Sequence, residues 1–380
     1  MNYFKILVFL QYGDKSQFDI PVEEQKRFLD SIGEARNDID RGYKQYLCQN
    51  FLVPDWKKWL LNIVSALIVP FVVLYYLVKG IFSKQGEHVD AMIERKGMEE
   101  VVPFVVRKLY HPDNRFWDEG SSMTIKDVPF LMELVKKGPF HPYFVLKSLM
   151  NVALYSDAIR RHTPSVMIQF GEFSYSSSIL TTYCHRNGVR HIDIMHGEKL
   201  WYIRDAFFHY DECYVWDEHY IDLFRKLKAE PNQFVVALPE SMHIDTQIHN
   251  NKDVYADYKY YLGVISESEL RGVVESMQFA IRNGKKVKYR PHPRYTDLNL
   301  LRKYVQEEDI EDNKKVSILE SISNVDYAVG SYTTVLSQAY FSGKKVMLDD
   351  VTFKSEYDKL KKLNYILSSK NVPKLSEMQG

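Results

Sequence analysis

Cysteine is scarce in this chain of 380 residues, and neither sign of charge predominates. The three cysteines, Cys48, Cys184 and Cys213, form no CxxC pair, which argues against a disulfide framework and a cysteine-rich zinc site. Lys and Arg total 50, as do Asp and Glu, whereas a protein built to bind phosphate backbones would carry a basic excess. We therefore expect a protein of a reducing, cytosolic compartment that does not bind nucleic acid.

The short motifs of several enzyme classes are also missing. The sequence contains no GxGxxG, GxxxxGK[ST], HExxH or GxSxG. This argues against a dinucleotide fingerprint, a P-loop, a catalytic zinc and an α/β-hydrolase nucleophile. An apolar stretch at residues 4–10 lacks a charged flank and a cleavage signal, so we do not expect a signal peptide.

One long apolar run stands out from this average composition. Residues 59–82 (WLLNIVSALIVPFVVLYYLVKGIF) contain a single charge, Lys79. A helix of this length would extend about 36 Å, enough to cross a bilayer core. Aromatic and basic residues of the kind found at membrane interfaces flank the run: Trp56, Lys57, Lys58, Trp59 and Lys84. We expect membrane association, as a kinked span or a shallow re-entrant hairpin around Pro70, with a buried pair of core helices as the alternative.

The chain then alternates strand and helix patterns. Strands at 166–170 (VMIQF) and 190–195 (RHIDIM) enclose a helical segment at 176–187, a βαβ unit that predicts a parallel sheet. Residues 85–135 show no clear pattern. Other elements are expected at 4–10 (strand), 22–50 (helix), 144–161 (helix), 214–216 (strand), 218–227 (helix) and 234–238 (strand).

A second series of the same kind follows a polar stretch at 239–256. Its expected strands are 258–265, 286–289, 327–329 and 345–348, and its expected helices are 267–283, 298–305, 318–321 and 334–341. We predict an α/β fold of two Rossmann-like domains with a central cleft, residues 1–238 and 257–380, joined by the linker 239–256. In such sheets ligands bind beyond the carboxyl ends of the strands.

Two loops of the first domain carry candidate chemistry. Glu172 follows the strand at 166–170, where a carboxylate can serve as general base for a hydroxyl nucleophile; the alternative is a solvated loop acid. His196, Gly197 and Glu198 follow the next strand. Gly197 permits close backbone approach, His196 suits a phosphate or hydroxyl, and Glu198 is the rival base. The alternative is a turn that needs Gly197 for its backbone angle.

The loop at residues 290–294 (RPHPR) is the strongest short signal. Two prolines restrict the backbone on either side of His292. A histidine flanked by Arg290 and Arg294 suits a phosphate leaving group, because the imidazole donates a proton or hydrogen bond and the guanidiniums neutralise charge. The alternative is a structural turn with solvated arginines.

A hydroxyl-rich helix start follows the strand at 327–329. Gly330, Ser331, Thr333 and Thr334 lead into a helix whose free N–H groups can bind an anion. The alternative is an ordinary N-cap. Because this loop and RPHPR lie in the same domain, we expect them to converge on one nucleotide phosphate.

RPHPR and SYTT at 331–334 together resemble the His-Pro motif and the downstream Ser/Thr motif of bacterial sialyltransferases and polysialyltransferases, which are GT-B glycosyltransferases. Related β-Kdo transferases carry a similar His-Pro element. The resemblance covers about residues 165–350. It implies that His292 contacts the phosphate of CMP as an acid and that Ser331, Thr333 and Thr334 bind this phosphate. We also expect the donor site to include His196, Gly197, Arg290, Pro293, Arg294 and Gly330.

The first domain departs from the family's pattern, which places an acid-acid-glycine triplet at the general base. Here GEFSYSS at 171–177 offers Glu172 and HGEK at 196–199 offers Glu198, and neither forms the triplet. Both remain candidates for the base. The HGE loop with the segment after it is also similar to capsule and teichoic-acid assembly proteins.

The resemblance implies an inverting, metal-independent glycosyltransferase that needs no cofactor beyond its nucleotide-sugar donor. Sialic acid or a related ulosonic acid would pass from CMP, held by 257–380, to a glycan or glycolipid acceptor on 1–238. The setting would be capsule or lipopolysaccharide synthesis on the cytoplasmic side of the inner membrane, with peripheral or monotopic attachment. Three alternatives stay open: a CDP-polyol phosphotransferase, a UDP-sugar 2-epimerase and a non-enzymatic membrane-bound assembly factor.

Overall fold

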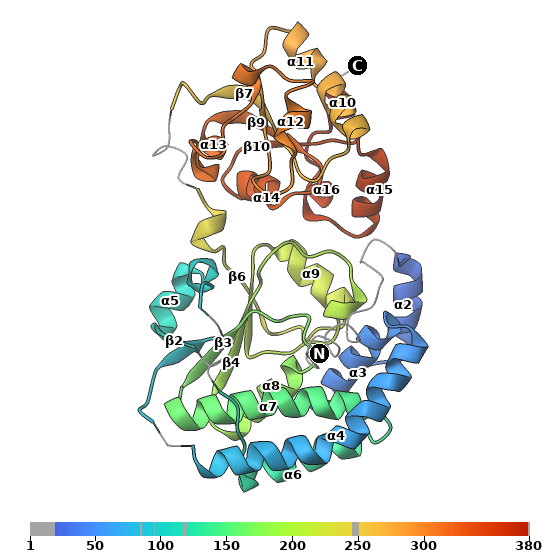
Figure 1. Cartoon of the computed structure of the whole chain (residues 1–380), viewed down its shortest axis with the longest axis vertical. Coiled ribbons are helices and arrows are strands. Elements are labelled where there is room, and N and C mark those ends of the chain that lie inside the picture. The colour runs from blue at the N-terminus through green and yellow to red at the C-terminus, as the bar shows by residue number, and fades with distance from the viewer. Residues whose placement is uncertain (1–19, 84–85, 95, 117–119, 245–250, 379–380) are drawn as a thin grey trace. The chain divides into compact units, whose positions relative to one another are not determined.

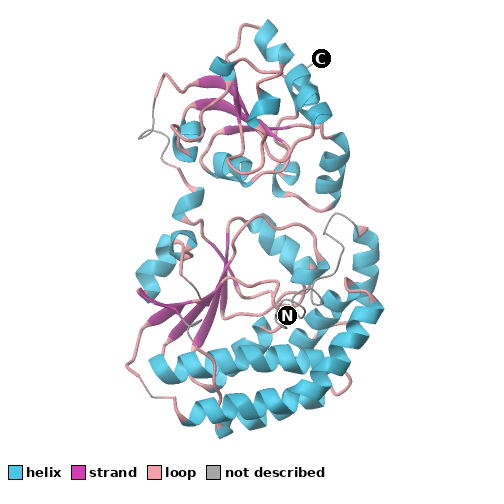
Figure 2. Cartoon of the chain, in the orientation of Figure 1, coloured by secondary structure: helices cyan, strands magenta, loops and turns pink. Residues whose placement is uncertain are grey.

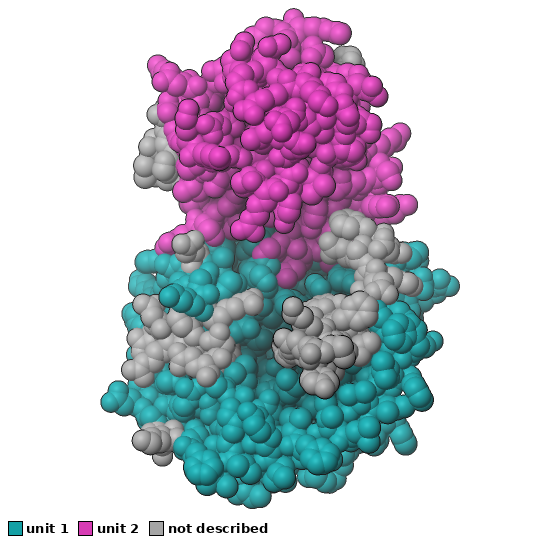
Figure 3. Space-filling model, in the orientation of Figure 1, with its two compact units in different colours: residues 1–196, 201–239 teal, residues 197–200, 240–380 magenta. Residues whose placement is uncertain are grey.

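The computed structural model describes residues 20–83, 86–94, 96–116, 120–244 and 251–378. The strand predicted at 4–10 lies outside these residues. The chain forms two compact units, coloured separately in Figure 3: unit 1 comprises residues 1–196 and 201–239, and unit 2 comprises residues 197–200 and 240–380. Each unit is built on a parallel sheet with helices around it (Figures 1 and 2), which confirms the predicted α/β class.

The sheet of unit 1 has the strand order β2-β1-β3-β4-β5-β6, with parallel pairing throughout. Its strands are β1 (Ala91–Ile93), β2 (Pro112–Phe116), β3 (Val166–Gln169), β4 (Arg190–Ile194), β5 (Glu212–Val215) and β6 (Phe234–Val236). β3 is buried along its whole length, as expected for an apolar strand in a parallel sheet. The predicted strands at 166–170 and 190–195 are therefore confirmed as neighbours.

The helices of unit 1 are α2 (Val22–Ser31), α3 (Asp38–Phe51), α4 (Asp55–Ile81), α5 (Phe104–Tyr110), α6 (Val128–Lys137), α7 (Pro142–His162), α8 (Ser177–Arg186) and α9 (Glu218–Lys226). The long helix α7 lies at their centre and packs against α4, α6 and α8. Residues on several sides of α7 are buried, so its hydrophobic pattern is not confined to one stripe.

The apolar run forms one continuous helix, α4, and the predicted re-entrant hairpin is wrong. Pro70 removes one backbone hydrogen bond, to the carbonyl of Ala66. Both residues are exposed, so this loss lies on the outer side of the helix and does not break the packed side. Among the described residues, α4 is the one helix long and apolar enough to cross a membrane by length and composition.

Unit 2 has a four-stranded parallel sheet of order β10-β9-β7-β8. Its strands are β7 (Ala256–Tyr261), β8 (Val287–Arg290), β9 (Val325–Gly330) and β10 (Lys345–Leu348). Its helices are α10 (Glu267–Ser276), α11 (Gln278–Arg282), α12 (Leu298–Leu301), α13 (Ile318–Ser323), α14 (Thr334–Phe341), α15 (Lys354–Lys362) and α16 (Ile366–Ser369). The chain passes from β7 to β8 on one side and then to β9 on the other, which creates a topological switch point between β7 and β9.

Candidate functional site

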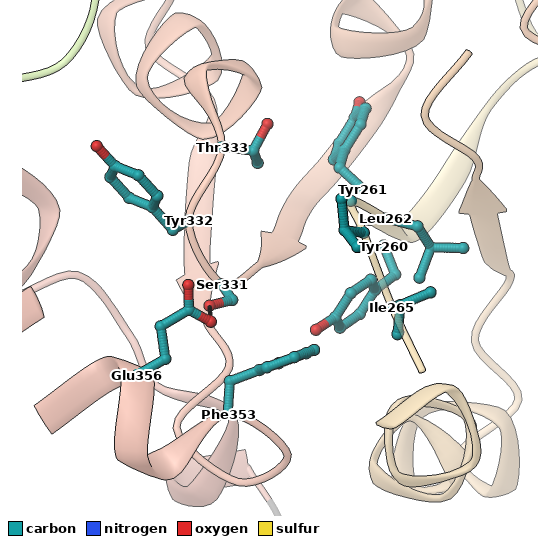
Figure 4. Close-up of a pocket in the computed structure, with 11 residues that line it drawn as sticks. Tyr260, Tyr261, Leu262, Ile265, Ser331, Tyr332, Thr333, Phe353 and Glu356 are labelled. Carbon is teal, nitrogen blue, oxygen red and sulfur yellow. Dashed lines mark hydrogen bonds between the residues drawn. The ribbon is translucent and has the colours of Figure 1, made fainter. Parts of the chain in front are cut away.

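A pocket opens at the switch point of unit 2, where doubly wound sheets bind ligands. Its volume is about 250 Å³, and its lining comes from the loops after β7 and β9 and from the start of α15 (Figure 4). The lining residues are Tyr260, Tyr261, Leu262, Gly263, Val264, Ile265, Ser331, Tyr332, Thr333, Phe353 and Glu356. Two of the residues predicted to bind phosphate, Ser331 and Thr333, therefore share one cavity.

The polar side of the pocket combines a hydroxyl, a carboxylate and a helix N-terminus. The Ser331 hydroxyl donates a hydrogen bond of 2.7 Å to Glu356 (Figure 4). Thr333 is the N-cap of α14, and its hydroxyl oxygen accepts from the Val335 amide at 3.4 Å. The first-turn N–H groups of α14 thus begin at the pocket, where the helix favours an anion. Thr334 is exposed at the first position of α14.

Aromatic and aliphatic side chains form the rest of the lining. Figure 4 shows Phe353 on the side of Glu356, with Leu262 and Ile265 across from it. The Tyr260 hydroxyl donates to buried Asp349 at 2.6 Å, which fixes the orientation of the tyrosine ring. A fixed aromatic wall beside a polar wall suits a ligand with a flat ring and several hydroxyl or phosphate groups.

The His292 loop is joined to the rim of this pocket through Thr296. The Thr296 hydroxyl accepts from the His292 amide at 2.9 Å and donates to the carbonyl of Gly263 at 3.0 Å. Gly263 lines the pocket. The loops after all three strands β7, β8 and β9 therefore meet at one edge of the sheet, as predicted for the RPHPR and SYTT motifs.

The geometry around His292 selects one form of its imidazole ring. The Arg294 amide donates to Nδ1 at 3.1 Å, so in the neutral ring the proton resides on Nε2. The ring also stacks on Tyr295, with centroids 4.5 Å apart. Partial burial, and then the charge of Arg294, lower the pKa of His292 below its ordinary value. The ring is accordingly a neutral donor near pH 7, with Nε2–H available to an acceptor.

Arg290 makes buried contacts that the sequence did not predict, and its phosphate role stays a prediction. It is only 8% exposed, its guanidinium pairs with Glu311 at 2.5 Å, and it also donates to the carbonyl of Val316 at 3.0 Å. Lys259 pairs with the same carboxylate. Arg290 therefore belongs to a buried ion-pair network in which two cations, Arg290 and Lys259, share the single carboxylate of Glu311. Pro293 and Arg294 are exposed, and Gly330 is buried at the end of β9.

Replacing Arg290 with Ala is expected to lower the free energy of unfolding by about 1.5–3 kcal/mol, because buried Glu311 would lose one charged hydrogen-bond partner and keep only Lys259. Arg294→Ala, at the exposed end of the motif, should change it by less than about 0.5 kcal/mol. Urea denaturation of both variants measures the difference. Unchanged stability of Arg290→Ala with loss of nucleotide binding would restore the predicted phosphate role.

In unit 1, Glu172 and His196 lie together beyond the carboxyl ends of the neighbouring strands β3 and β4. Glu172 Oε2 is 3.9 Å from His196 Nδ1. The glutamate side chain is 0% exposed and the histidine side chain is 28% exposed. Of the two groups, the imidazole is thus the one that solvent and a substrate can reach.

Buried hydrogen bonds fix the loop that carries Glu172. The Gly171 amide donates to Asp193 Oδ1 at 2.8 Å, and the side-chain amide of Gln45 donates to the carbonyl of Glu172 at 2.8 Å. Asp193 and Gln45 are themselves buried. These hydrogen bonds use buried polar groups to fix the loop and with it the position of the Glu172 carboxylate. Such support is expected for a loop that carries a functional side chain.

Glu198, the rival base, belongs to a different unit from Glu172. Residues 197–200 are part of unit 2, where Glu198 accepts a hydrogen bond of 3.1 Å from the Ser337 hydroxyl on α14. Gly197 has φ +74°, in the region that favours glycine, which fits the alternative of a turn that needs this backbone angle; its predicted contact with the donor stays a prediction.

Several site residues were not singled out from the sequence. Glu356 lies in a lysine-rich helix and reads there as a solvated acid, and Phe353 and Tyr260 read as ordinary core residues. Gln45 lies on a helix far from Glu172 in the chain. Within the described residues no cluster of three potential metal-ligating side chains forms, and the metal-independent reaction remains a prediction.

The chain matches no protein-family model and no curated protein. Among solved structures it is similar to the wall teichoic acid polymerase TagF, with a TM-score of 0.44 and 11% identity over 86% of this chain and 89% of that one. It is also similar to the glycotransferase of kitacinnamycin, with a TM-score of 0.41 and 10% identity over 70% of this chain and 81% of that one. For the UDP-GlcNAc 2-epimerase of Methanocaldococcus jannaschii, the TM-score is 0.35 and the identity is 13%, over 53% of this chain and 65% of that one. Similarities this distant establish neither a family nor a function for this chain.

Proposed function

We propose that this protein is an inverting glycosyltransferase that uses a CMP-activated donor, sialic acid or a related ulosonic acid. The observation that carries the proposal is the pocket at the switch point of unit 2, where the start of α14 and the rim tied to His292 combine. This places anion-binding groups and a neutral hydrogen-bond donor at one ligand-binding edge.

Each part of a nucleotide is assigned a partner in the pocket or at its rim. The carboxylate of Glu356 accepts hydrogen bonds from ribose hydroxyls, in place of the Ser331 hydroxyl that it binds in the structure. The ring of Phe353 faces the base. Ser331, Thr333 and the first N–H groups of α14 hold the phosphate, and His292 Nε2–H donates to a phosphate oxygen as negative charge develops there.

In the proposed reaction an acceptor hydroxyl attacks the anomeric carbon of the donor. The new bond joins the acceptor oxygen to that carbon, while the bond from that carbon to the phosphate oxygen breaks and its electron pair leaves with CMP. His196 takes the hydroxyl proton, and Glu172 behind it stabilises the imidazolium that forms. Attack opposite the departing CMP inverts the configuration. The acceptor is a glycan or glycolipid of a bacterial surface polysaccharide.

A donor screen tests the proposed activity. Full-length protein is incubated with an acceptor extract and CMP-sialic acid, CMP-Kdo, CDP-glycerol or UDP-GlcNAc, and the released nucleotide is quantified. The proposal expects CMP release from a CMP-sugar that depends on the acceptor. Release from CDP-glycerol alone would favour the polyol phosphotransferase, and turnover of UDP-GlcNAc without acceptor would favour the epimerase.

Glu356→Gln is expected to weaken CMP binding roughly 10- to 100-fold, because hydrogen bonds to a charged group contribute about 1.5–3 kcal/mol. The matched control is Asp358→Asn, an exposed acid on the same helix, which should leave the affinity unchanged. Calorimetry with CMP and 2′-deoxy-CMP sharpens the test. Wild type should prefer CMP and Glu356→Gln should lose most of this preference; an unaltered preference would contradict the ribose assignment.

A further inference from the structure

Helix α4 has two different faces along its length. Its inner face packs on α7, with Leu61, Ser65 and Tyr76 buried in the core of unit 1. Its outer face exposes a series of large apolar side chains at steps of three or four residues, continued by the C-cap: Trp56, Trp59, Ile63, Leu67, Phe71, Leu74, Tyr75, Val78, Ile81 and Phe82. We call this series the outer stripe. Exposed apolar surface of this extent marks an interaction site.

Specific contacts make α4 a fixed part of unit 1. The Tyr143 amide donates to Asn62 Oδ1 at 3.2 Å, and the Met123 amide donates to the carbonyl of Tyr76 at 3.0 Å. Near the end of the helix the backbone approaches so closely that a Cβ on Gly80 would lie 1.8 Å from the Met123 carbonyl oxygen. A transmembrane orientation would have to detach the inner face from this core and leave Asn62 and Ser65 in lipid.

The distribution of charge identifies the occupant of the outer stripe. Between Trp56 and Ile81 the helix contains no Asp or Glu, and the two cations that solvent reaches, Lys58 and Lys79, lie near its ends, whereas Lys57 is buried. Tryptophans lie at one end, and the Lys79 ammonium lies 5.5 Å over Tyr75 at the other. A protein interface has an apolar centre with a polar rim around it. A helix face that is apolar along its length and aromatic and basic at its ends instead suits a membrane, with its apolar side chains among the acyl chains and its cations at anionic lipid headgroups.

We propose that α4 lies in the plane of a membrane and inserts the outer stripe into a single leaflet rich in anionic phospholipid, so that unit 1 is monotopic and no segment of α4 crosses the bilayer. The inference rests on the two faces of α4, its fixed inner contacts and its charge distribution. It is independent of the nucleotide chemistry proposed above.

Vesicle flotation tests the binding. Full-length protein is mixed with phosphatidylcholine vesicles, with or without phosphatidylglycerol, and the floating fraction is measured. We expect binding that is stronger with phosphatidylglycerol and that falls at least about tenfold in Leu67→Glu/Phe71→Glu/Leu74→Glu, with an unchanged melting temperature. The control, Ile281→Glu/Leu319→Glu, alters two exposed apolar residues of unit 2 and should bind like wild type.

Thiol labelling distinguishes the in-plane helix from a span. The three native cysteines are buried, so the background is low. Asp55→Cys before the outer stripe and Glu87→Cys beyond it each place one thiol at an exposed position, and each protein is added outside preformed vesicles. An impermeant maleimide should label both variants without detergent. Protection of one end until detergent is added would establish a span and overturn the proposal, as would equal flotation of the triple-Glu variant.

Self-association that the triple-Glu variant abolishes, without vesicle binding, would instead assign the outer stripe to a second copy of the chain.

Discussion

Replacing His196 with Ala is expected to lower kcat for sugar transfer by about 10²- to 10⁴-fold, the usual contribution of a general base. CMP affinity should stay within about twofold of wild type, because His196 lies in unit 1 and the nucleotide pocket is formed by residues of unit 2. The expected signature is therefore a catalytic defect with intact binding. Transfer rates at saturating donor, together with calorimetry for CMP, measure the two quantities separately.

Variants of the two glutamates make this prediction specific. Glu172→Gln should also lower kcat, since the carboxylate 3.9 Å from His196 no longer stabilises the imidazolium, and Glu172→Asp should recover part of the loss. Glu198→Gln, which alters the rival base bonded to Ser337, should change kcat by less than about threefold. The opposite ranking, with Glu198→Gln inactive and His196→Ala active, would make Glu198 the base.

Replacing His292 with Ala is expected to lower kcat/KM by about 10²- to 10³-fold, the effect of losing one donor to a developing negative charge. Unlike His196→Ala, it should also weaken CMP binding, because the same Nε2–H group contacts the phosphate in the bound state. His292→Gln, whose amide can donate from a position near Nε2, should recover part of the activity. Wild-type binding in His292→Ala would exclude His292 from the nucleotide site.

The dependence of CMP affinity on pH tests the protonation state of His292. Because partial burial and Arg294 hold the pKa of His292 below its ordinary value, the ring is mostly neutral from about pH 7.5 upward and should donate equally well from there to about pH 8.5. An imidazolium donor would instead lose affinity as pH rises through this range, because its proton dissociates. Calorimetric titration of CMP across these pH values distinguishes the two states, and a steep decline would contradict the neutral donor.

The chain from about residue 165 onward could be predicted well because its short apolar strands and capped helices repeat regularly. The strands expected at 166–170, 190–195, 286–289 and 345–348 all appear, each displaced by no more than one residue. By contrast, β1 and β2 lie in the stretch without a clear pattern. Three to five residues with no alternation carry too little signal when neighbouring strands supply most of the stabilisation.

Single side chains of the site were harder to predict than its loops. RPHPR and SYTT do reach one edge of the sheet, because parallel strands bring their carboxyl ends together. Arg290, however, is the last residue of β8, and its guanidinium forms an ion pair with the buried acid Glu311. Glu311 lies outside the RPHPR motif in the sequence, so the motif alone does not predict this pair. The burial of Glu172 behind His196 likewise depends on tertiary packing, which the local sequence pattern does not predict.

Calorimetric titration of the full-length protein with CMP and with UDP tests most directly whether unit 2 holds the nucleotide of a CMP-activated donor. We predict one CMP site per chain, weak or absent UDP binding, and loss of the CMP heat in His292→Ala with its retention in His196→Ala. Binding of UDP without CMP, or CMP binding that survives both His292→Ala and Glu356→Gln, would contradict the assignment of the pocket.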